Sequence, residues 1–447
     1  MASRANFHRT SDRLLPRLVS RRRRAGFTLI ELMVALTGGL FFSIFVFALT
    51  RDVTRFFQRE ARLTDATLSA LTGFERLRTD VTRSGFLVSP NLVKDPRRCP
   101  QVTEGTATDN YPLGWNGQDR LKRVAALRVT ADATIADNAL LKLQTPAITP
   151  DSLLLYGNYT SSEQFPVLSI DGVGSAAPEV ILDPTSGALW RSGYDSTKLA
   201  TDAANVAVIA AMFPVGRALR VVTPEGEEQY AIIDSTSVRG LNPRIVLTQN
   251  PSLIEKGVGN NCGLRGLSNG VMVNPVNIIE YRLRDLKTDL GSADAQVGYL
   301  FSSEAPVGES RLELVRSELS PGTDATPLAG SLEVVAEYAV DFRVGVTAVT
   351  DVAATRALKP FTQADSAFAR FAGDPLGATA AAVNSGPHLV RAAHLRLSVR
   401  TLDEDRQGNA GAVTSPAFRF KLADNRFARV RTLQAVVATR NTRNMTW

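Results

Sequence analysis

Residues 21–50 read RRRRAGFTLIELMVALTGGLFFSIFVFALT, and the organisation of the whole chain follows from this segment. Four arginines end at Arg24, and residues 27–50 carry a single charge, Glu31. As a helix, residues 27–50 span about 36 Å, whereas the hydrocarbon core of a bilayer is about 30 Å thick. We therefore predict a membrane-spanning helix over residues 27–50.

The arginines also predict how this helix is oriented. No comparable basic cluster follows residue 50, so the positive-inside rule keeps the N-terminus cytoplasmic and exports everything after the helix. A secretory signal peptide is the first alternative, but its apolar region would be shorter and a small-residue cleavage site would follow it. Here Thr50-Arg51-Asp52 continues without such a site.

Glu31 is the unusual residue of the apolar segment. A carboxylate at the centre of a membrane span costs about 2.5–3.5 kcal/mol on insertion scales, and less near an end. Such a group usually has a partner, and the alternative is a side chain that reaches the cytoplasmic interface. Glu31 is therefore a candidate functional residue.

The string Arg-Arg-Arg-Arg-Ala-Gly26 followed by Phe27-Thr28-Leu29-Ile30-Glu31-Leu32 resembles the prepilin processing signal of type IV pilins, pseudopilins and related filament subunits. The resemblance implies that residues 1–26 are a leader, that prepilin peptidase cuts after Gly26, and that Phe27 becomes an N-methylated N-terminus. It also implies that Glu31 pairs in the filament with the N-terminal ammonium of a neighbouring subunit. Two departures are a leader longer than most in the family and Gly38-Gly39 as the weak point of the helix, which has no proline.

Most of the chain's basicity belongs to the predicted leader. The 447 residues carry a net charge of +7, and the leader holds eight arginines against one aspartate. Without the leader, 43 basic and 43 acidic residues remain, so the body is formally neutral. Nucleic acid is therefore not indicated as a partner.

The two cysteines, Cys99 and Cys262, are too few for a disulfide framework and form no C-x-x-C pair. In the periplasm a single disulfide between them is a candidate, and two unpaired thiols are the alternative.

Residues 51–84 predict an amphipathic stem helix that continues the membrane span. They contain no proline and one glycine, Gly73, and Gly85 would end the helix near residue 84. Apolar positions recur every three to four residues, at Val53, Phe56, Phe57, Leu63, Thr67, Leu68, Leu71, Phe74, Leu77 and Val81.

Residues 85–447 predict a large, mainly antiparallel β-rich head, because many segments alternate apolar and polar positions between Gly, Pro, Asn and Asp. The fold class is α+β, a pilin-like lollipop in which the long N-terminal helix packs on the head. The candidate strands are 121–130, 152–157, 218–223, 229–234, 244–248, 278–284, 297–302, 311–316, 333–346, 389–401, 416–421 and 430–439. Segments 333–340 and 430–438 fit short helices as well.

Two layers are expected within the head. The stem and residues 270–447 form a scaffold, and residues of about 95–265 form an insert, with Cys99 and Cys262 near its two edges. Residues 351–386, of low complexity and rich in Ala, Asp and Gly, are expected to be a loop or an insertion, and residues 183–205 read similarly.

Four short strings in the body resemble PilW-like minor pilins. They are Arg78-x-Asp80 leading to Ser84-Gly85-Phe86, then Tyr281-Arg282-Leu283, Val390-Arg391, and Val436-Val437-x-x-Arg440-Asn441. The resemblance implies a minor pilin, and GspJ-like pseudopilins are the next candidates. The implied partners are major and minor pilins, prepilin peptidase, the inner-membrane assembly machinery and a tip adhesin.

We predict no catalytic, metal or cofactor site, and therefore no enzyme. No nucleophile elbow, P-loop or H-E-x-x-H string occurs. His388 and His394 are about 20 Å apart along an extended strand, too far to hold one metal ion. The acidic turn of Asp403, Glu404, Asp405 and Asn409 lacks EF-hand spacing.

The expected function is that of a minor pilin, which helps to initiate a type IV pilus or forms its tip in motility, adhesion or DNA uptake. The alternatives are a type II secretion pseudopilin and a tip binding module. The expected location is the inner membrane, with a periplasmic head, and then the extracellular pilus.

Overall fold

A computed structural model divides the chain into two compact units, residues 1–61 and 62–447. The described residues are 27–99, 119–173, 177–239, 242–249, 251–257, 261–266, 269–286, 311–322, 327–350, 357–376, 386–401, 419–423 and 426–442. The predicted strand 297–302 and the acidic turn at 403–409 lie outside these ranges.

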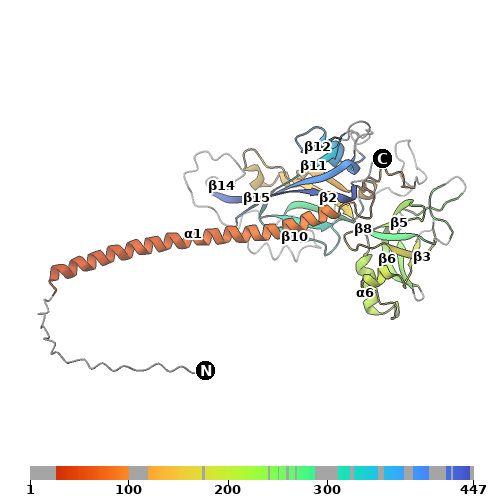
Figure 1. The fold of residues 1–447 in the computed structure, drawn as a ribbon, viewed down its shortest axis with the longest axis horizontal. Helices are drawn as coiled ribbons and strands as arrows, with labels where there is room; N and C mark the ends of the chain where they lie inside the picture. The colour runs from red at the N-terminus through yellow and green to blue at the C-terminus, as the bar shows by residue number, and fades with distance from the viewer. Residues whose placement is uncertain are drawn as a thin grey trace, which may run out of the picture. The chain divides into compact units, whose positions relative to one another are not determined.

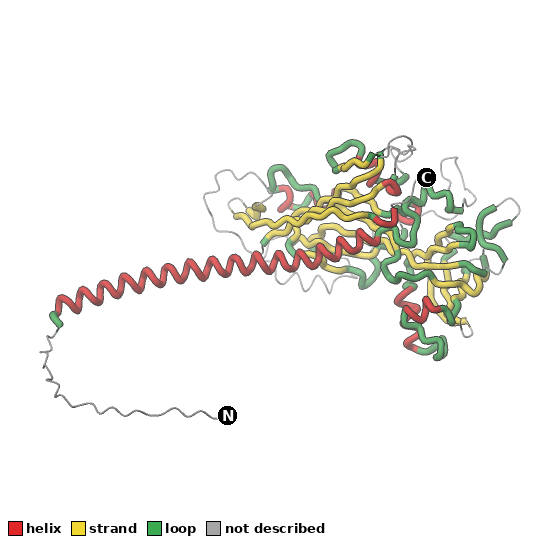
Figure 2. The backbone as a smooth tube through the Cα atoms, viewed as in Figure 1, coloured by secondary structure: helices red, strands yellow, loops and turns green. Residues whose placement is uncertain are grey.

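The N-terminal helix α1 runs from Leu29 to Arg83 without interruption (Figures 1 and 2), which confirms the predicted long helix. It ends where Gly85 predicts, because Gly85 adopts φ 75° and its amide donates to the carbonyl of Tyr156 at 2.7 Å. Its buried face starts later than the periodicity predicts. Ala70, Phe74, Leu77 and Val81 are buried, whereas Val53, Phe56, Phe57 and Leu68 are exposed.

The last third of the head contributes a five-stranded antiparallel sheet. Its order is β12 (Leu358–Phe361), β11 (Ala339–Val349), β13 (Val390–Arg400), β15 (Arg426–Ala438) and β14 (Arg419–Ala423). The buried residues of β11, β13 and β15 alternate with polar ones, so one face of the sheet belongs to the core.

A second antiparallel sheet is built around β8 (Met272–Asp285), the longest strand described. The C-terminal half of β8 pairs with β2 (Asp151–Gly157) on one side and β9 (Leu312–Glu318) on the other. The edge strands are β1 (Leu127–Ala131) beside β2 and β10 (Glu333–Ala336) beside β9.

The N-terminal half of β8 belongs to a closed barrel. It pairs with β3 (Phe165–Asp171) and β5 (Ala218–Val222), and those two are joined through β4 (Glu179–Leu182), β7 (Asn242–Leu247) and β6 (Glu228–Arg239). Each neighbouring pair is antiparallel, and the six pairings form a ring that leaves no free edge.

Three clusters of buried side chains match these layers. The first cluster joins the end of α1 to two layers, the sheet of β11–β15 and the sheet around the C-terminal half of β8. Its members include Phe74, Leu77, Leu153, Tyr281 and Phe342. The second fills the barrel, and the third lies beside it around Tyr156 and Tyr230. Figure 1 shows β3, β5 and β6 grouped with α6, apart from the group of β11 and β15.

The remaining helices are short. They are α2 (Asp119–Lys122), α3 (Ala133–Ala136), α4 (Ala139–Lys142), α5 (Gly187–Arg191), α6 (Ala203–Met212) and α8 (Phe368–Ala372), with 3-10 turns η3 (Pro387–Leu389) and η4 (Arg440–Thr442). Helices α5 and α6 pack on the barrel core through Leu189, Ile209 and Met212.

The boundary of the predicted insert stays a prediction, and the packing favours a narrower one. Strands β1 and β2 lie within the predicted 95–265, yet their buried residues belong to the cluster that contains the stem. The barrel cluster runs from Phe165 to Val273. We therefore propose that the insert comprises residues of about 158–271.

Several local predictions were wrong for physical reasons. Residues 183–205 contain α5 and the start of α6, and 351–386 contains β12 and α8, so neither segment is simply a loop. The predicted strand 121–130 begins as α2. The predicted strand 333–346 is divided into β10 and β11, because Tyr338 between them has φ 52°, which no strand residue adopts. The helical alternatives for 333–340 and 430–438 are excluded, since β10 and β15 are strands.

Gly73 lets the stem approach the sheet closely. A Cβ atom at this position would lie 1.7 Å from the backbone carbonyl oxygen of Val335 in β10. In most helices Gly→Ala is stabilising by about 0.5–1 kcal/mol. Here we expect Gly73→Ala to destabilise the head by about 1–3 kcal/mol, since α1 and β10 must move apart.

Chemical denaturation of the full chain in detergent, followed by circular dichroism, measures this effect. Gly257→Ala is the matched control, because an added Cβ there meets nothing within 4 Å. A stability gain for Gly73→Ala would show that the close approach of helix and strand does not exist.

Candidate processing and assembly site

The described residues begin directly after the predicted cleavage point. Gly26 lies outside the described residues, and Phe27 is the first residue within them. The Phe27 side chain is 84% exposed, so this position is open at the start of the helix.

Thr28 and Glu31 form a reciprocal cap at the start of α1. The Glu31 carboxylate oxygen Oε2 accepts hydrogen bonds from the backbone N–H of Thr28 at 3.1 Å and from its hydroxyl at 3.0 Å. In return the Glu31 N–H donates to Thr28 Oγ1 at 3.3 Å. This is a capping box, and it places the carboxylate in the first turn, where the helix dipole favours a negative charge.

The role of Thr28 was missed at the sequence level. The signal was present, because Thr28-x-x-Glu31 before an apolar run is the capping-box pattern. Glu31 therefore has an intramolecular partner in the single chain, in addition to the neighbouring subunit that the resemblance implies.

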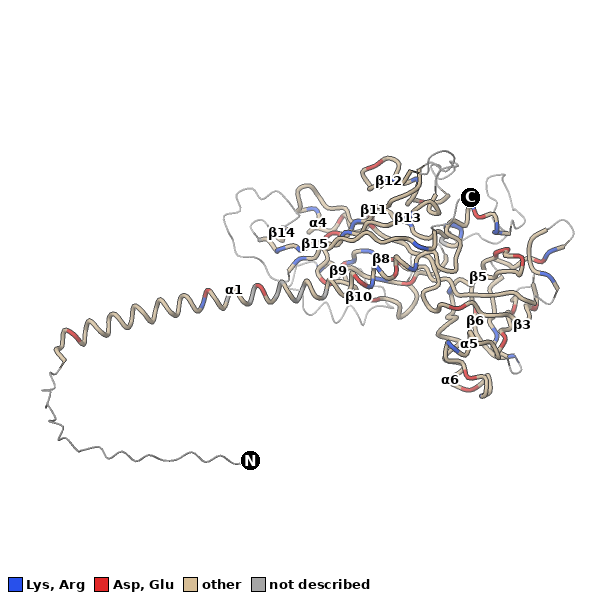
Figure 3. The backbone as a smooth tube through the Cα atoms, in the orientation of Figure 1, with Lys and Arg blue, Asp and Glu red and all other residues tan. Residues whose placement is uncertain are grey.

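The helix that follows is apolar and unburied. All residues from 27 to 54 are exposed, and the segment Leu29–Thr54 is long and apolar enough to cross a membrane. Figure 3 shows the corresponding part of α1 almost without charged residues after Glu31. Its leucine, isoleucine, valine and phenylalanine side chains form a surface that water disfavours.

The far end of the stem is fixed to the head by Asp80, which is 3% exposed. Tyr281 in β8 donates its hydroxyl to Asp80 Oδ2 at 2.8 Å, and Arg316 in β9 donates Nε to the same oxygen at 2.7 Å. The Tyr159 hydroxyl donates to the Asp80 carbonyl at 2.9 Å. Burial and the nearby Asp80 charge raise the pKa of Tyr281, so its phenol stays a hydrogen-bond donor.

The four short strings in the body meet at this end of the stem. Besides the Asp80–Tyr281 bond, Asn441 donates its side-chain amide to the carbonyl of Ser84 at 2.9 Å. The hydroxyl of Thr439, inside the last string, donates to the Val390 carbonyl at 3.1 Å. These residues therefore share one structural task, which is to hold the helix end against β8, β13 and the end of the chain.

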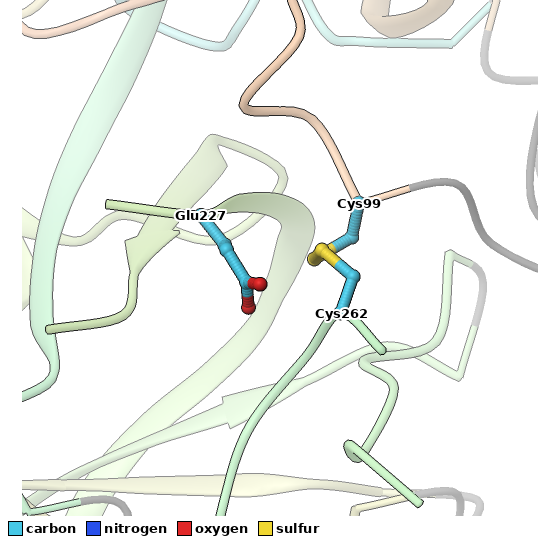
Figure 4. Close-up of side chains that lie close together, drawn as sticks. All are labelled: Cys99, Glu227 and Cys262. Atoms are coloured by element: carbon cyan, nitrogen blue, oxygen red, sulfur yellow. A yellow bond between two sulfur atoms is a disulfide. The ribbon is translucent and has the colours of Figure 1, made fainter. Parts of the chain in front are cut away.

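Cys99 and Cys262 form a disulfide, with 5.3 Å between their Cα atoms (Figure 4). Cys99 is buried, and its N–H donates to the carbonyl of Glu228 at the start of β6, at 3.1 Å. The disulfide therefore links the segment between α1 and α2, which contains Cys99, to the barrel.

Glu227 lies beside this disulfide, and one of its carboxylate oxygens is within 4.8 Å of both sulfur atoms. The group has the residue types of a metal site, but sulfur atoms joined to each other are not thiolate ligands. Glu227 also accepts a hydrogen bond from the Gly263 N–H at 3.0 Å and lies 3.4 Å from Lys256 Nζ. In the disulfide form this group has a structural role.

The two histidines of the body are held separately. His388 is fully buried in η3, and its Nδ1 lies 3.1 Å from the side-chain amide of Asn91. His394 lies in β13, where Nε2 is 2.6 Å from the Thr347 hydroxyl. Their hydrogen bonds go to different elements of the head.

The comparisons with known proteins agree with the N-terminal site. The prokaryotic N-terminal methylation motif matches residues 21–37. The chain therefore has the N-terminus of a type IV pilin-like protein. The match covers the arginines, the predicted cleavage point and the capped helix start, and pilin-like proteins are typically structural and not enzymes. No curated protein matches the chain.

A solved structure of a type IV-like pilin from Thermus thermophilus is similar to this pilin-like chain at 14% identity. The similarity covers 53% of this chain and 93% of that one, with a TM-score of 0.16. The architecture described above, a long apolar helix followed by antiparallel sheets, therefore stands on the chain's own strand pairings.

Proposed function

We propose that this pilin-like chain is a minor pilin, cleaved after Gly26 and incorporated into a type IV pilus through its N-terminal helix. The observation that carries the proposal is the methylation motif placed directly before an exposed apolar helix. Such a helix is stable in a bilayer and, after cleavage, among the helices of neighbouring subunits.

The head supports the assignment to a minor subunit. The helix carries a large head that contains two antiparallel sheets, a closed barrel and a disulfide and that is anchored to the stem at Asp80. The PilW-like strings meet at the stem end, where they position helix and head. A type II secretion pseudopilin remains the second candidate, since the same N-terminal motif serves both systems.

The partners and location follow from this proposal. Prepilin peptidase removes residues 1–26, and the inner-membrane assembly machinery then transfers the subunit to the filament. Major and minor pilins are the neighbours. The N-terminus faces the cytoplasm before cleavage, and the head is periplasmic.

Mass spectrometry of the membrane-extracted protein tests the processing step. The expected N-terminus is Phe27 carrying one methyl group. In Gly26→Leu we expect the leader to be retained. An intact leader in the native chain, or cleavage beyond residue 50, contradicts the proposal.

The assembly step requires variants that separate the charge of Glu31 from its capping role. Glu31→Gln keeps an oxygen that caps Thr28 but removes the negative charge, whereas Thr28→Ala keeps the charge and removes the hydroxyl. We expect both variants to be cleaved, and only Glu31→Gln to be depleted, by about tenfold or more, from sheared pili. Equal incorporation of both variants would contradict the proposed pairing between the Glu31 carboxylate and the N-terminal ammonium of a neighbouring subunit.

A further inference from the structure

A cleft of about 620 Å³ lies on the polar face of the five-stranded sheet. Its floor is formed by β11, β13 and β15, and its lip by the residues that follow β12. This volume falls within the range of ligand-binding clefts in proteins. Nothing in the proposed processing and assembly functions uses it.

The lip of the cleft is held in place on both sides. The Phe361 ring stacks on Phe371 of α8 with ring centroids 4.9 Å apart. The backbone N–H and hydroxyl of Thr362 donate to Asp365 Oδ2 at 2.6 Å and 3.0 Å, which closes the turn that carries Gln363. The cleft therefore exists without a ligand, and binding would not have to order it.

The charges in and directly beside the cleft are balanced. Asp341 of β11 does not line the cleft itself, but it accepts from two residues that do, from Arg343 Nε at 3.0 Å and from Arg396 Nη2 at 2.6 Å. Asp151 is the second carboxylate, and its Oδ1 lies 3.7 Å from Arg343 Nη1. Two guanidinium groups thus face two carboxylates, so neither a cationic nor an anionic ligand is favoured by net charge.

Two polar groups at the cleft have hydrogen-bonding capacity that is not used. Asp151 is fully buried, and its Oδ2 accepts from the Val344 N–H at 2.7 Å, but Oδ1 has no hydrogen-bond partner among the described residues. Gln363 Nε2 is likewise a buried donor with no described acceptor. Burial raises the pKa of Asp151 to about 6, so the carboxylate is still mostly ionised near neutral pH. Such groups cost stability unless something completes their hydrogen bonds.

These features together define a ligand class. A hydroxyl group both donates and accepts, so neighbouring hydroxyls match one free carboxylate oxygen and one free amide N–H. Apolar side chains also line the wall, with Pro360, Phe361 and the exposed Val436 available to the C–H faces of a ring. The neutral charge balance excludes a ligand selected mainly by its charge.

We propose that this cleft binds a neutral, hydroxyl-rich ring, that is, one sugar residue of a glycan. Asp151 Oδ1 accepts from one hydroxyl and Gln363 Nε2 donates to another, while Phe361 and Pro360 cover the ring face. The proposal stands independently of the processing motif, because it concerns the head alone.

Ligand-observed saturation-transfer NMR on the full chain tests the proposal directly. The chain is kept in lauryldimethylamine oxide, because detergents with sugar headgroups would compete. The neutral probes are glucose, galactose and N-acetylglucosamine, and the charged probes are glucosamine and glucuronate. We expect saturation transfer to at least one neutral sugar, and at least tenfold weaker binding of its charged counterparts.

Variants then assign the binding to the cleft. Gln363→Ala removes the free donor from a partly exposed loop, so folding is retained, and we expect at least a tenfold rise in Kd. Asp151→Asn should weaken binding as well, and circular dichroism checks that it folds. Gln249→Ala, at an exposed position outside the cleft, is the matched control and should bind as the native chain does.

Three results would overturn the proposal. They are the absence of saturation transfer from all three neutral sugars, equal binding of charged and neutral probes, and unchanged binding in Gln363→Ala. None of these results depends on cleavage after Gly26 or on pilus assembly, so failure here leaves the proposed function untouched.

Discussion

Replacing Asp80 by alanine is expected to lower the free energy of unfolding of the head by about 3–5 kcal/mol. Asp80 is the buried acceptor for Arg316 of β9 and Tyr281 of β8, and the side chain of Arg316 is only 12% exposed. Removal of the carboxylate leaves a guanidinium without its closest partner in a poorly solvated place. The cost of that uncompensated charge exceeds the net value of the ion pair itself.

Glu75→Ala provides the matched control for Asp80→Ala. Glu75 lies on the same helix and also pairs with an arginine, Arg78, but their side chains are 60% and 44% exposed. Exposed pairs of this kind contribute about 0–1 kcal/mol. Urea denaturation followed by circular dichroism compares the two variants. A loss for Asp80→Ala no greater than that for Glu75→Ala would mean that the stem is not anchored at this residue.

The second large effect is expected from the double variant Cys99→Ser, Cys262→Ser. The disulfide closes a loop between residues 163 apart in the sequence, so its main contribution is to restrict the unfolded chain. The chain-entropy relation gives about 5 kcal/mol for a loop of this length, and native disulfides usually contribute about 2–5 kcal/mol. We expect a loss of about 3–5 kcal/mol.

A reductant separates this effect from damage caused by the substitutions. Dithiothreitol should destabilise the native chain to about the level of the double variant and should leave the double variant unchanged. The stabilities are read from the same denaturation curves, and thiol counting by mass spectrometry reports the redox state. If the reduced native chain keeps its full stability, the disulfide contributes nothing and the staple hypothesis is wrong.

Local patterns predicted a large part of this structure. Sequence patterns predicted the apolar helix, its end near Gly85 and most strands between residues 152 and 438. Each of these features depends on residues that are close in sequence. The cleavage motif was likewise contiguous. The capping role of Thr28 was within reach by the same reasoning.

What could not be predicted depends on long-range pairing. The barrel closes only because β3 and β5 meet opposite edges of β8, and no local pattern reports that register. Helix α6 was missed because AANVAVIAAM is apolar on every side and has no amphipathic period. The cleft joins Asp151 to Gln363 and His394 across more than 200 residues, so the sequence did not predict that these residues line one cleft.

The division of β8 between two structures has a mechanical consequence. The C-terminal half of β8 is hydrogen-bonded to β2 and β9, next to the Asp80 anchor, and its N-terminal half is one strand of the barrel. Tension applied to the stem therefore enters β8 and β9 through Asp80 and loads several flanking ladders together. The continuous backbone of β8 then carries the force into the barrel, so the proposed insert also bears part of the load.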